Sequence, residues 1–266
     1  MRDDTLNYGG YIQVSGNFPR RNIKMKQYFF ILSILIISCS TKQVMKIPVD
    51  SENASSIKTK IDTQTSKAEV IETFSDSLNI GEKGKSKIEI IKHRVLDDTY
   101  VIVKFYTKRP KYWSLQNTYL YECYALMDLN ANIQDFNNDK FNDITFISGT
   151  AARGANEVRR LFIYDDKEKQ LISIINSENY PNMLYNDKLN CIDAFLVYGG
   201  TSTVFLKIEK DSLAEFASVN SSDGNRTVYE IDKFGKEKLI RNDTLLDEDD
   251  IYIRYKNFNP IEKYKE

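Results

Sequence analysis

The chain has 266 residues, with 37 Lys and Arg against 38 Asp and Glu, which gives a formal net charge of −1 at pH 7. A chain this close to neutral lacks the basic footprint of nucleic-acid-binding domains, so nucleic acid is not expected as a partner. The whole chain contains one histidine and three cysteines, so few residues are available for His- or Cys-dependent catalysis.

Residues 25–39, MKQYFFILSILIISC, have the layout of a secretory signal: a basic start, an apolar run of ten residues and small residues at the end. A helix needs about 20 apolar residues to cross a bilayer, so this run is too short to span one. We expect translation to begin at Met25, residues 1–24 to be a leader outside the true protein, and residues 25–38 to be a signal peptide.

The end of this segment, Ile36 to Cys39, resembles a bacterial lipobox, in which the Cys is lipidated and the signal peptide is cut just before it. The resemblance implies a lipid on Cys39 and a membrane-anchored lipoprotein of the bacterial cell envelope, in the periplasm or at the cell surface. A plain secretory signal with an incidental Cys and a membrane-spanning anchor are the alternatives. No polybasic membrane patch is evident in the sequence, so attachment is expected to rest on the lipid.

The residues after Cys39 are rich in Ser, Thr and Lys, and they contain no aromatic residue before Phe74. Such a composition buries too little apolar surface to offset chain entropy, so we expect a flexible tether over residues 39–86. A short helix around 68–74 is an open alternative within it.

From Lys87 onward the composition of the sequence changes, and a β-rich domain is expected over residues 87–266. Short runs rich in Val, Ile, Tyr and Phe alternate with Asn, Asp, Gly and Lys turns, a pattern typical of strands. The predicted strands are 87–93, 99–106, 118–127, 143–148, 158–164, 170–175, 192–199, 203–209, 226–232, 236–241 and 250–255, with 209–217 undecided.

Short polar turns at 165–169, 221–224 and 233–235 connect predicted strands that are adjacent in sequence. Hairpins in series predict an all-β antiparallel meander, arranged as a small propeller-like domain, a barrel or a sandwich. About 180 residues are enough for one domain with its own core. Cys123 and Cys191 both lie on predicted strands, and whether they form a disulfide stays open.

The sequence shows no recognisable catalytic motif, so no catalytic residue is predicted and we expect a non-enzymatic protein. His93 lies on a predicted strand, and neither Ser nor Cys occurs in a nucleophile-elbow pattern. Paired carboxylates could in principle hydrolyse a carbohydrate, which keeps a surface carbohydrate hydrolase as the alternative. A structural envelope lipoprotein with neither role is a third reading.

The stretch QDFNNDKFND, residues 134–143, places oxygen-bearing side chains at positions 1, 3, 5 and 9 of a tight loop. Calcium prefers six to eight oxygen ligands from carboxylates, amides and backbone carbonyls. A calcium site is therefore predicted on Asp135, Asn137, Asp139 and Asp143, with Phe141 giving its carbonyl oxygen. An EF-hand is excluded because Lys140 stands where Gly is usual and Phe146 where a bidentate Glu belongs. The alternative is a simple Asn/Asp-rich turn.

About 75 residues, 135 to 209, follow an order that resembles a family of exported bacterial β-proteins with the pattern D-x-N-x-D-G-x-x-D. That family includes calcium-bound, propeller-like proteins related to periplasmic inhibitors of invertebrate-type lysozyme, and immunity lipoproteins that block a cell-wall hydrolase. The resemblance implies a peptidoglycan hydrolase as partner, with calcium stiffening the scaffold. No inhibitory loop can be placed on a motif here, so the partner-binding residues are unknown. Arg153, Asn156 and Arg159 are candidate contacts, with a solvated loop as the alternative reading.

Overall fold

A computed structural model describes residues 68–245 and 251–265 of the chain. The predicted leader, signal peptide, lipidated Cys39 and most of the tether lie outside these residues. Among the described residues the regular structure is almost entirely β, in four antiparallel sheets, and no helix is long and apolar enough to cross a bilayer. The prediction of an all-β antiparallel fold is confirmed.

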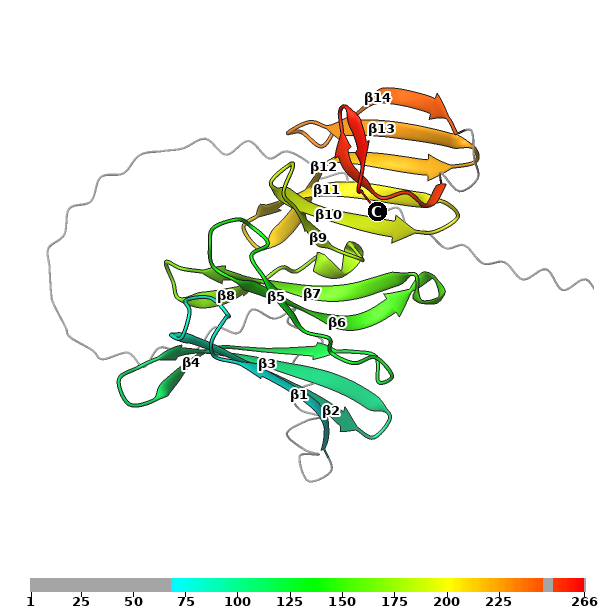
Figure 1. Cartoon of the computed structure of the whole chain (residues 1–266). Coiled ribbons are helices and arrows are strands. Elements are labelled where there is room, and N and C mark those ends of the chain that lie inside the picture. Colours follow the sequence, from blue (N-terminus) through cyan, green and yellow to red (C-terminus); the bar gives the residue numbers. More distant parts are fainter. Residues whose placement is uncertain (1–67, 246–250, 266) are drawn as a thin grey trace, which may run out of the picture. The chain divides into compact units, whose positions relative to one another are not determined.

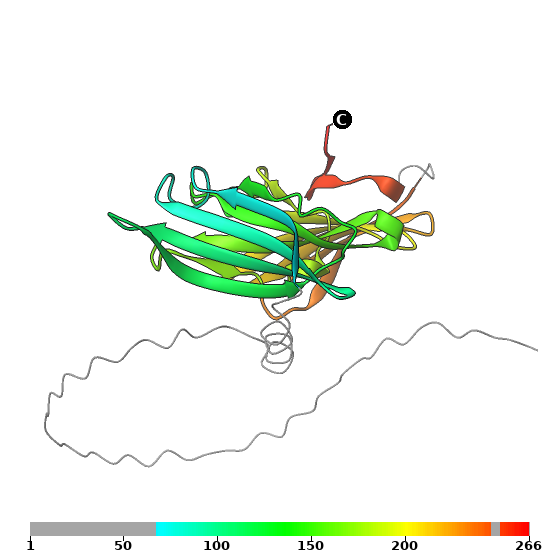
Figure 2. The ribbon, with the colours of Figure 1, turned by 90° about the horizontal axis from the view of Figure 1, so that it is seen from below.

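Sheet I has the order β1-β2-β3-β4, in which every strand pairs with its sequence neighbour. Its strands are β1 (Glu69–Asp76), β2 (Ser86–Val95), β3 (Asp98–Lys108) and β4 (Trp113–Glu122). Figure 2 looks onto the outer side of this sheet. Strand β1 differs from the prediction, which placed a tether or a short helix here. Its sequence, EVIETFSD, forms an edge strand that pairs on one side only and has no buried residue.

Sheet II has the order β5-β6-β7-β8. It comprises β5 (Asn132–Gln134), β6 (Asp143–Ala151), β7 (Asn156–Asp165) and β8 (Gln170–Ser173), with the 3₁₀ turns η2 (Ala152–Gly154) and η3 (Ser177–Asn179). Seven successive residues of β6, from Asp143 to Gly149, are buried, because this sheet is covered on both faces.

Sheet III has the order β14-β13-β12-β11-β10-β9, and a short fourth sheet pairs β15 with β16. The strands are β9 (Leu184–Asn186), β10 (Cys191–Val197), β11 (Thr201–Glu209), β12 (Ser212–Ser222), β13 (Asn225–Ile231), β14 (Glu237–Thr244), β15 (Tyr255–Phe258) and β16 (Ile261–Lys263). The undecided stretch 209–217 contains the last residue of β11, a two-residue turn and the first half of β12. The predicted strand 250–255 is wrong, because Ile251 and Tyr252 form a 3₁₀ turn and the strand begins only at Tyr255.

Three apolar layers join these sheets into a stack, which can be followed from sheet I upward in Figure 1. Between sheets I and II the core is formed by side chains such as Phe105, Phe146 and Phe162. Between sheets II and III it includes Leu161, Ile163, Val204 and Leu206, and between sheet III and the β15–β16 hairpin it includes Phe205, Val219 and Tyr255. Alternate residues of β7 and β11 therefore face different cores, which explains the continuous apolar runs LFIY (161–164) in β7 and VFL (204–206) in β11.

Candidate functional site

The predicted calcium loop connects β5 to β6, and its first carboxylate organises the turn. Asp135 Oδ1 accepts the backbone N–H of Asn137 at 3.3 Å and of Asp139 at 3.2 Å, and Oδ2 accepts that of Lys140 at 2.8 Å. Lys140 has φ 77°, so the chain makes the turn that usually requires Gly with a Lys instead. The loop therefore has the tight backbone that the spacing predicts.

Asn137 and Asp139 complete the upper part of the loop. Asn137 Nδ2 donates to Asp139 Oδ2 at 2.8 Å, and Asp139 Oδ1 accepts the N–H of Phe141 at 2.8 Å. The ring of Phe141 lies 5.4 Å from that of Tyr164, so its side chain packs inward while the backbone stays in the loop. The oxygens of Asp135, Asn137 and Asp139 are donors of the type that calcium prefers.

Asp143, the last predicted ligand, is fully buried and has a different set of contacts. Its Oδ2 accepts the N–H of Phe136 at 2.8 Å, and its Oδ1 accepts the N–H of Tyr164 at 2.8 Å. Burial raises the pKa of this carboxyl to about 8, with a further contribution from the charges of Asp139 and Asp135. Asp143 thus fastens the loop to β7. The spacing of the oxygen-bearing residues in the sequence did not predict this contact.

The donor set fits calcium in chemical type, but the described residues do not gather three His, Cys, Asp or Glu side chains into a metal-binding group. Gly81 and Asn142 hold the loop from the side of sheet I, because the Gly81 N–H donates to the Asn142 carbonyl at 2.8 Å. Gly81 has φ 54°, and a Cβ there would lie 2.8 Å from the Tyr164 ring, so only Gly fits.

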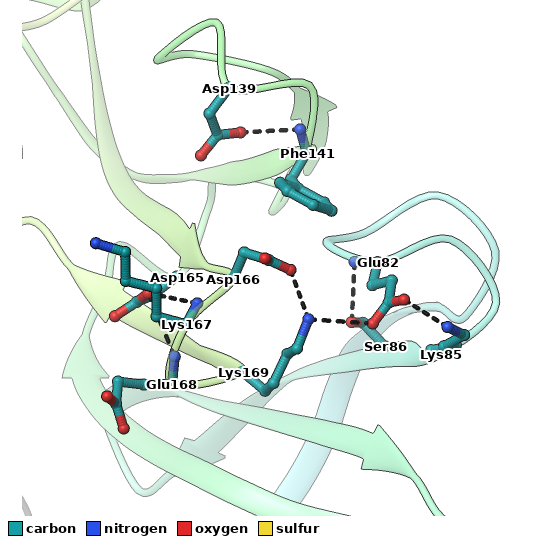
Figure 3. A network of polar contacts seen from close by, with 10 residues as sticks. All are labelled: Glu82, Lys85, Ser86, Asp139, Phe141, Asp165, Asp166, Lys167, Glu168 and Lys169. Carbon is teal, nitrogen blue, oxygen red and sulfur yellow. Dashed lines mark hydrogen bonds and ion pairs between the residues drawn. The ribbon is translucent and has the colours of Figure 1, made fainter.

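A second polar network crosses from sheet I to the β7–β8 turn near the same loop (Figure 3). Lys169 Nζ lies 2.5 Å from Asp166 Oδ1 and 3.4 Å from Glu82 Oε2, and Glu82 also pairs with Lys85 at 2.6 Å. These side chains are partly or largely exposed, so the ion pairs add little stability. They keep Lys85 and Lys169 engaged with carboxylates of the same surface.

A cleft of about 900 Å³ opens at the ends of β3, β4, β6 and β7, and it contains more acidic than basic side chains. Four carboxylate residues line it, namely Asp97, Asp98, Glu122 and Glu178. Arg160 pairs with Glu178 at 2.5 Å, and its guanidinium lies 4.2 Å from the centre of the Tyr121 ring. The hydroxyl of Ser148 donates to Glu178 at 2.7 Å. This cleft was not found from the sequence.

The segment Tyr124–Met127, here called the 124–127 loop, borders this cleft. Leu126 and Met127 line both the cleft and a second hollow of about 540 Å³, which also contains Glu72, Asp128 and Glu157. Leu126 is 96% exposed. The sequence predicted a strand through residue 127, but β4 ends at Glu122, and the chain turns out of sheet I there.

Buried polar contacts hold the 124–127 loop in place. Lys92, which is almost fully buried, donates through Nζ to the carbonyl oxygens of Ala125 and Met127. Tyr124 N–H donates to the Ser148 carbonyl at 2.9 Å, and both oxygens of Glu72 accept the N–H of Leu129, at 2.9 and 3.0 Å. The loop therefore presents Leu126 from a fixed backbone.

Two of the three candidate contact residues serve the fold instead. Asn156 is buried and exchanges two hydrogen bonds with the backbone of Val197, at 2.8 and 2.9 Å, which ties β7 to β10. Arg159 is buried too, and it donates to Glu157, to the Asn130 carbonyl and to Thr145 Oγ1. The solvated-loop interpretation was wrong for both, and only Arg153 is exposed on a turn.

The remaining reactive side chains do not form a nucleophilic pair within the described part of the chain. Cys123 and Cys191 are free, and burial raises the pKa of the two thiols to about 11 and about 12. Both therefore stay protonated near neutral pH, whereas nucleophilic cysteines act as thiolates. His93 Nδ1 is buried without a hydrogen-bond partner among these residues.

No protein-family model and no curated protein sequence matches the chain. Among solved structures, a Xanthomonas protein related to type IV secretion systems is similar at a TM-score of 0.41 and 9% sequence identity. The match covers 65% of this chain and 98% of the other. A likeness at this level does not extend to function. The resemblance to lysozyme inhibitors thus stays a prediction.

Proposed function

We propose that this chain is a lipid-anchored exported binding protein of the bacterial cell envelope, which inhibits a peptidoglycan hydrolase by steric block and is not itself an enzyme. One observation supports this proposal most strongly, namely the exposed Leu126 on the firmly held 124–127 loop. A loop whose backbone is already held in place loses little conformational entropy when it enters a cleft of another protein. The lipid on Cys39 would keep the protein at the membrane.

The charges around this loop indicate the kind of partner. The two hollows beside it contain seven acidic residues, namely Asp97, Asp98, Glu122, Glu178, Glu72, Asp128 and Glu157, and one basic residue, Arg160. Complementary potentials steer association and suppress wrong partners. We therefore expect a hydrolase with a basic rim around an apolar socket that accepts Leu126.

We expect Leu126→Asp to weaken binding to such a hydrolase by roughly thirtyfold or more, since a central apolar anchor is worth about 2 kcal/mol. Inhibition of lysis by purified lysozyme-type hydrolases, together with calorimetric binding, measures this effect. Phe234→Asp is the matched control, because Phe234 is also a highly exposed apolar residue, on the β13–β14 turn. No inhibition across several hydrolase classes would refute the inhibitor function.

A carbohydrate hydrolase is the second candidate, because the acidic cleft holds several carboxylates that could act as a catalytic pair. The same preparations discriminate the two functions. Release of sugar fragments by the protein alone, abolished by Glu122→Gln, would favour the hydrolase over the inhibitor.

Calcium is proposed as a structural ion of the β5–β6 loop, held by Asp135, Asn137 and Asp139, with the Phe141 carbonyl and Asp143 as the further predicted ligands. We expect millimolar calcium to raise the melting temperature above that in a chelator, because an ion that binds only the folded state stabilises it. The gain would be about 2.7 kcal/mol when calcium is at 100 times its Kd.

Asp139→Ala should abolish this difference. Asp232→Ala is the control, because Asp232 Oδ1 accepts the N–H groups of Phe234 and Lys236 in a turn of the same kind. It should lower stability slightly and keep the calcium effect. Identical melting curves with calcium and with chelator would refute the ion site.

A further inference from the structure

The tip of the β3–β4 hairpin gathers exposed basic and aromatic side chains. The Arg109 N–H donates to the Tyr112 carbonyl at 2.8 Å and closes the turn. Lys108 Nζ lies 5.8 Å from the centre of the Trp113 ring, and Tyr112 is 65% exposed. Lys108, Arg109 and Lys111 are exposed as well, so the tip presents cations beside two amphipathic rings.

A second turn adds another cation at the same end of sheet I. The Lys108 N–H donates to the Lys85 carbonyl at 2.7 Å, which places the 82–85 turn, with its exposed Lys83, against the hairpin. We call the resulting surface the basic tip; it consists of Lys83, Lys108, Arg109, Lys111, Tyr112 and Trp113. Lys85 is paired with Glu82, whereas none of the four cations of the tip is in an ion pair with a described residue.

Four like charges that are not paired with a carboxylate of the described residues repel one another, and this repulsion is relieved at an anionic surface. An anionic lipid leaflet attracts each nearby Lys or Arg by about 1 kcal/mol. Tyr and Trp carry an apolar ring with a polar group, and they concentrate at the boundary between lipid and water for that reason. Both parts of the tip thus match one partner, which is an anionic bilayer.

We propose that the basic tip is a membrane-docking element that rests on anionic lipid headgroups, with Tyr112 and Trp113 at the level of the headgroups. This contact is distinct from the lipid proposed on Cys39, and it does not depend on inhibition or on calcium. It would orient sheet I with its β3–β4 hairpin toward the bilayer.

Trp113 is the only tryptophan of the chain, so its fluorescence reports directly on the tip. The full chain is titrated with vesicles of phosphatidylcholine and phosphatidylglycerol, and separately with phosphatidylcholine alone. We expect the emission to move to shorter wavelength, and to be quenched by brominated acyl chains, only with the anionic vesicles. Raising the salt concentration should weaken the effect, because salt screens exposed charges.

The double variant Arg109→Glu/Lys111→Glu should weaken this response by roughly thirtyfold or more, since two attractive charges become repulsive. Lys210→Glu/Lys238→Glu changes the net charge equally on exposed positions of sheet III, and it should respond as the unchanged protein does. Thermal melts verify that both variants fold.

Two results would overturn the proposal. Binding of the chain to anionic vesicles without a change in Trp113 emission would show that another segment makes the contact. A Trp113 response to a soluble polyanion, without quenching by brominated lipid, would assign the tip to an anionic polymer instead.

Discussion

Arg254→Ala is expected to destabilise the protein by about 3 to 5 kcal/mol, because it leaves the fully buried carboxylate of Asp193 without its cation. Arg254 Nε donates to Asp193 Oδ1 at 2.7 Å, and Nη2 donates to the Asp193 carbonyl at 2.9 Å. Tyr264 Oη and Asn186 Nδ2 donate to Asp193 Oδ2, at 2.5 and 2.8 Å. This network fastens the C-terminal hairpin to β10.

Urea unfolding followed by circular dichroism measures the loss. An exposed ion pair offers the control, because Lys188 and Glu262 join the same hairpin to the β9–β10 turn and are each about 40% exposed. Lys188→Ala should therefore cost less than about 1 kcal/mol. Equal losses in the two variants would show that the hairpin, and not the buried charge, sets the effect.

A further variant separates charge burial from packing. Replacing both partners, as Asp193→Leu with Arg254→Met, removes the buried charges together and should recover part of the stability lost in Arg254→Ala. Tyr264 would then lose its acceptor and Asn186 one of its two acceptors, so recovery is expected to be incomplete. A double variant less stable than either single variant would contradict this account.

The strands that the sequence predicted best are those buried on one or both faces, because burial leaves a local pattern. The run TVFLK in β11 and the turn Asp223-Gly224 between β12 and β13 are readable from neighbouring residues alone. Strand β1 was missed because an edge strand with one exposed face tolerates Glu and Thr. The 124–127 loop was taken for strand because its Tyr, Leu and Met resemble core residues.

The features that tertiary contacts create were out of reach of the sequence. Lys92 supports the 124–127 loop from more than 30 residues away, and Lys83 joins the basic tip only because β2 pairs with β3. A polybasic patch was not expected, since the chain is nearly neutral and the tip is assembled from two separate turns. The regular spacing of oxygen-bearing side chains indicated the turn of the β5–β6 loop. It did not show which of these oxygens accept hydrogen bonds that hold the fold together.

Asp143→Ala tests whether the Asp143 side chain serves the fold rather than an ion, and we expect it to destabilise the protein by about 2 to 6 kcal/mol. The two backbone N–H groups of Phe136 and Tyr164 would lose their acceptor in a buried site, at about 1 to 3 kcal/mol each. Asp143→Asn keeps one acceptor oxygen and turns an amide donor toward the other N–H, so about half of that loss is expected.

Asp165→Ala is the control, because Asp165 Oδ1 also accepts two backbone N–H groups, those of Lys167 and Glu168, but in an exposed turn. Water replaces that acceptor, so the loss should be about 1 kcal/mol or less. The three variants are compared by urea unfolding in chelator, where calcium cannot contribute. If Asp143→Ala lowers the free energy of unfolding no more than Asp165→Ala does, Asp143 does not fasten the loop to β7 as inferred.

The same variants decide whether Asp143 also serves an ion. Asp143 is fully buried and fastens the loop to β7, whereas Asp135, Asn137 and Asp139 are partly or fully exposed and, among the described residues, their oxygens accept hydrogen bonds only within the loop. We therefore expect Asp135, Asn137 and Asp139 to supply the affinity for calcium and Asp143 to supply the scaffold. The calcium-dependent rise in melting temperature should then survive in Asp143→Asn on a lower baseline. If the rise disappears while Asp139→Ala retains it, the carboxylate of Asp143 is the ligand and the β5–β6 loop is only an Asx-rich turn.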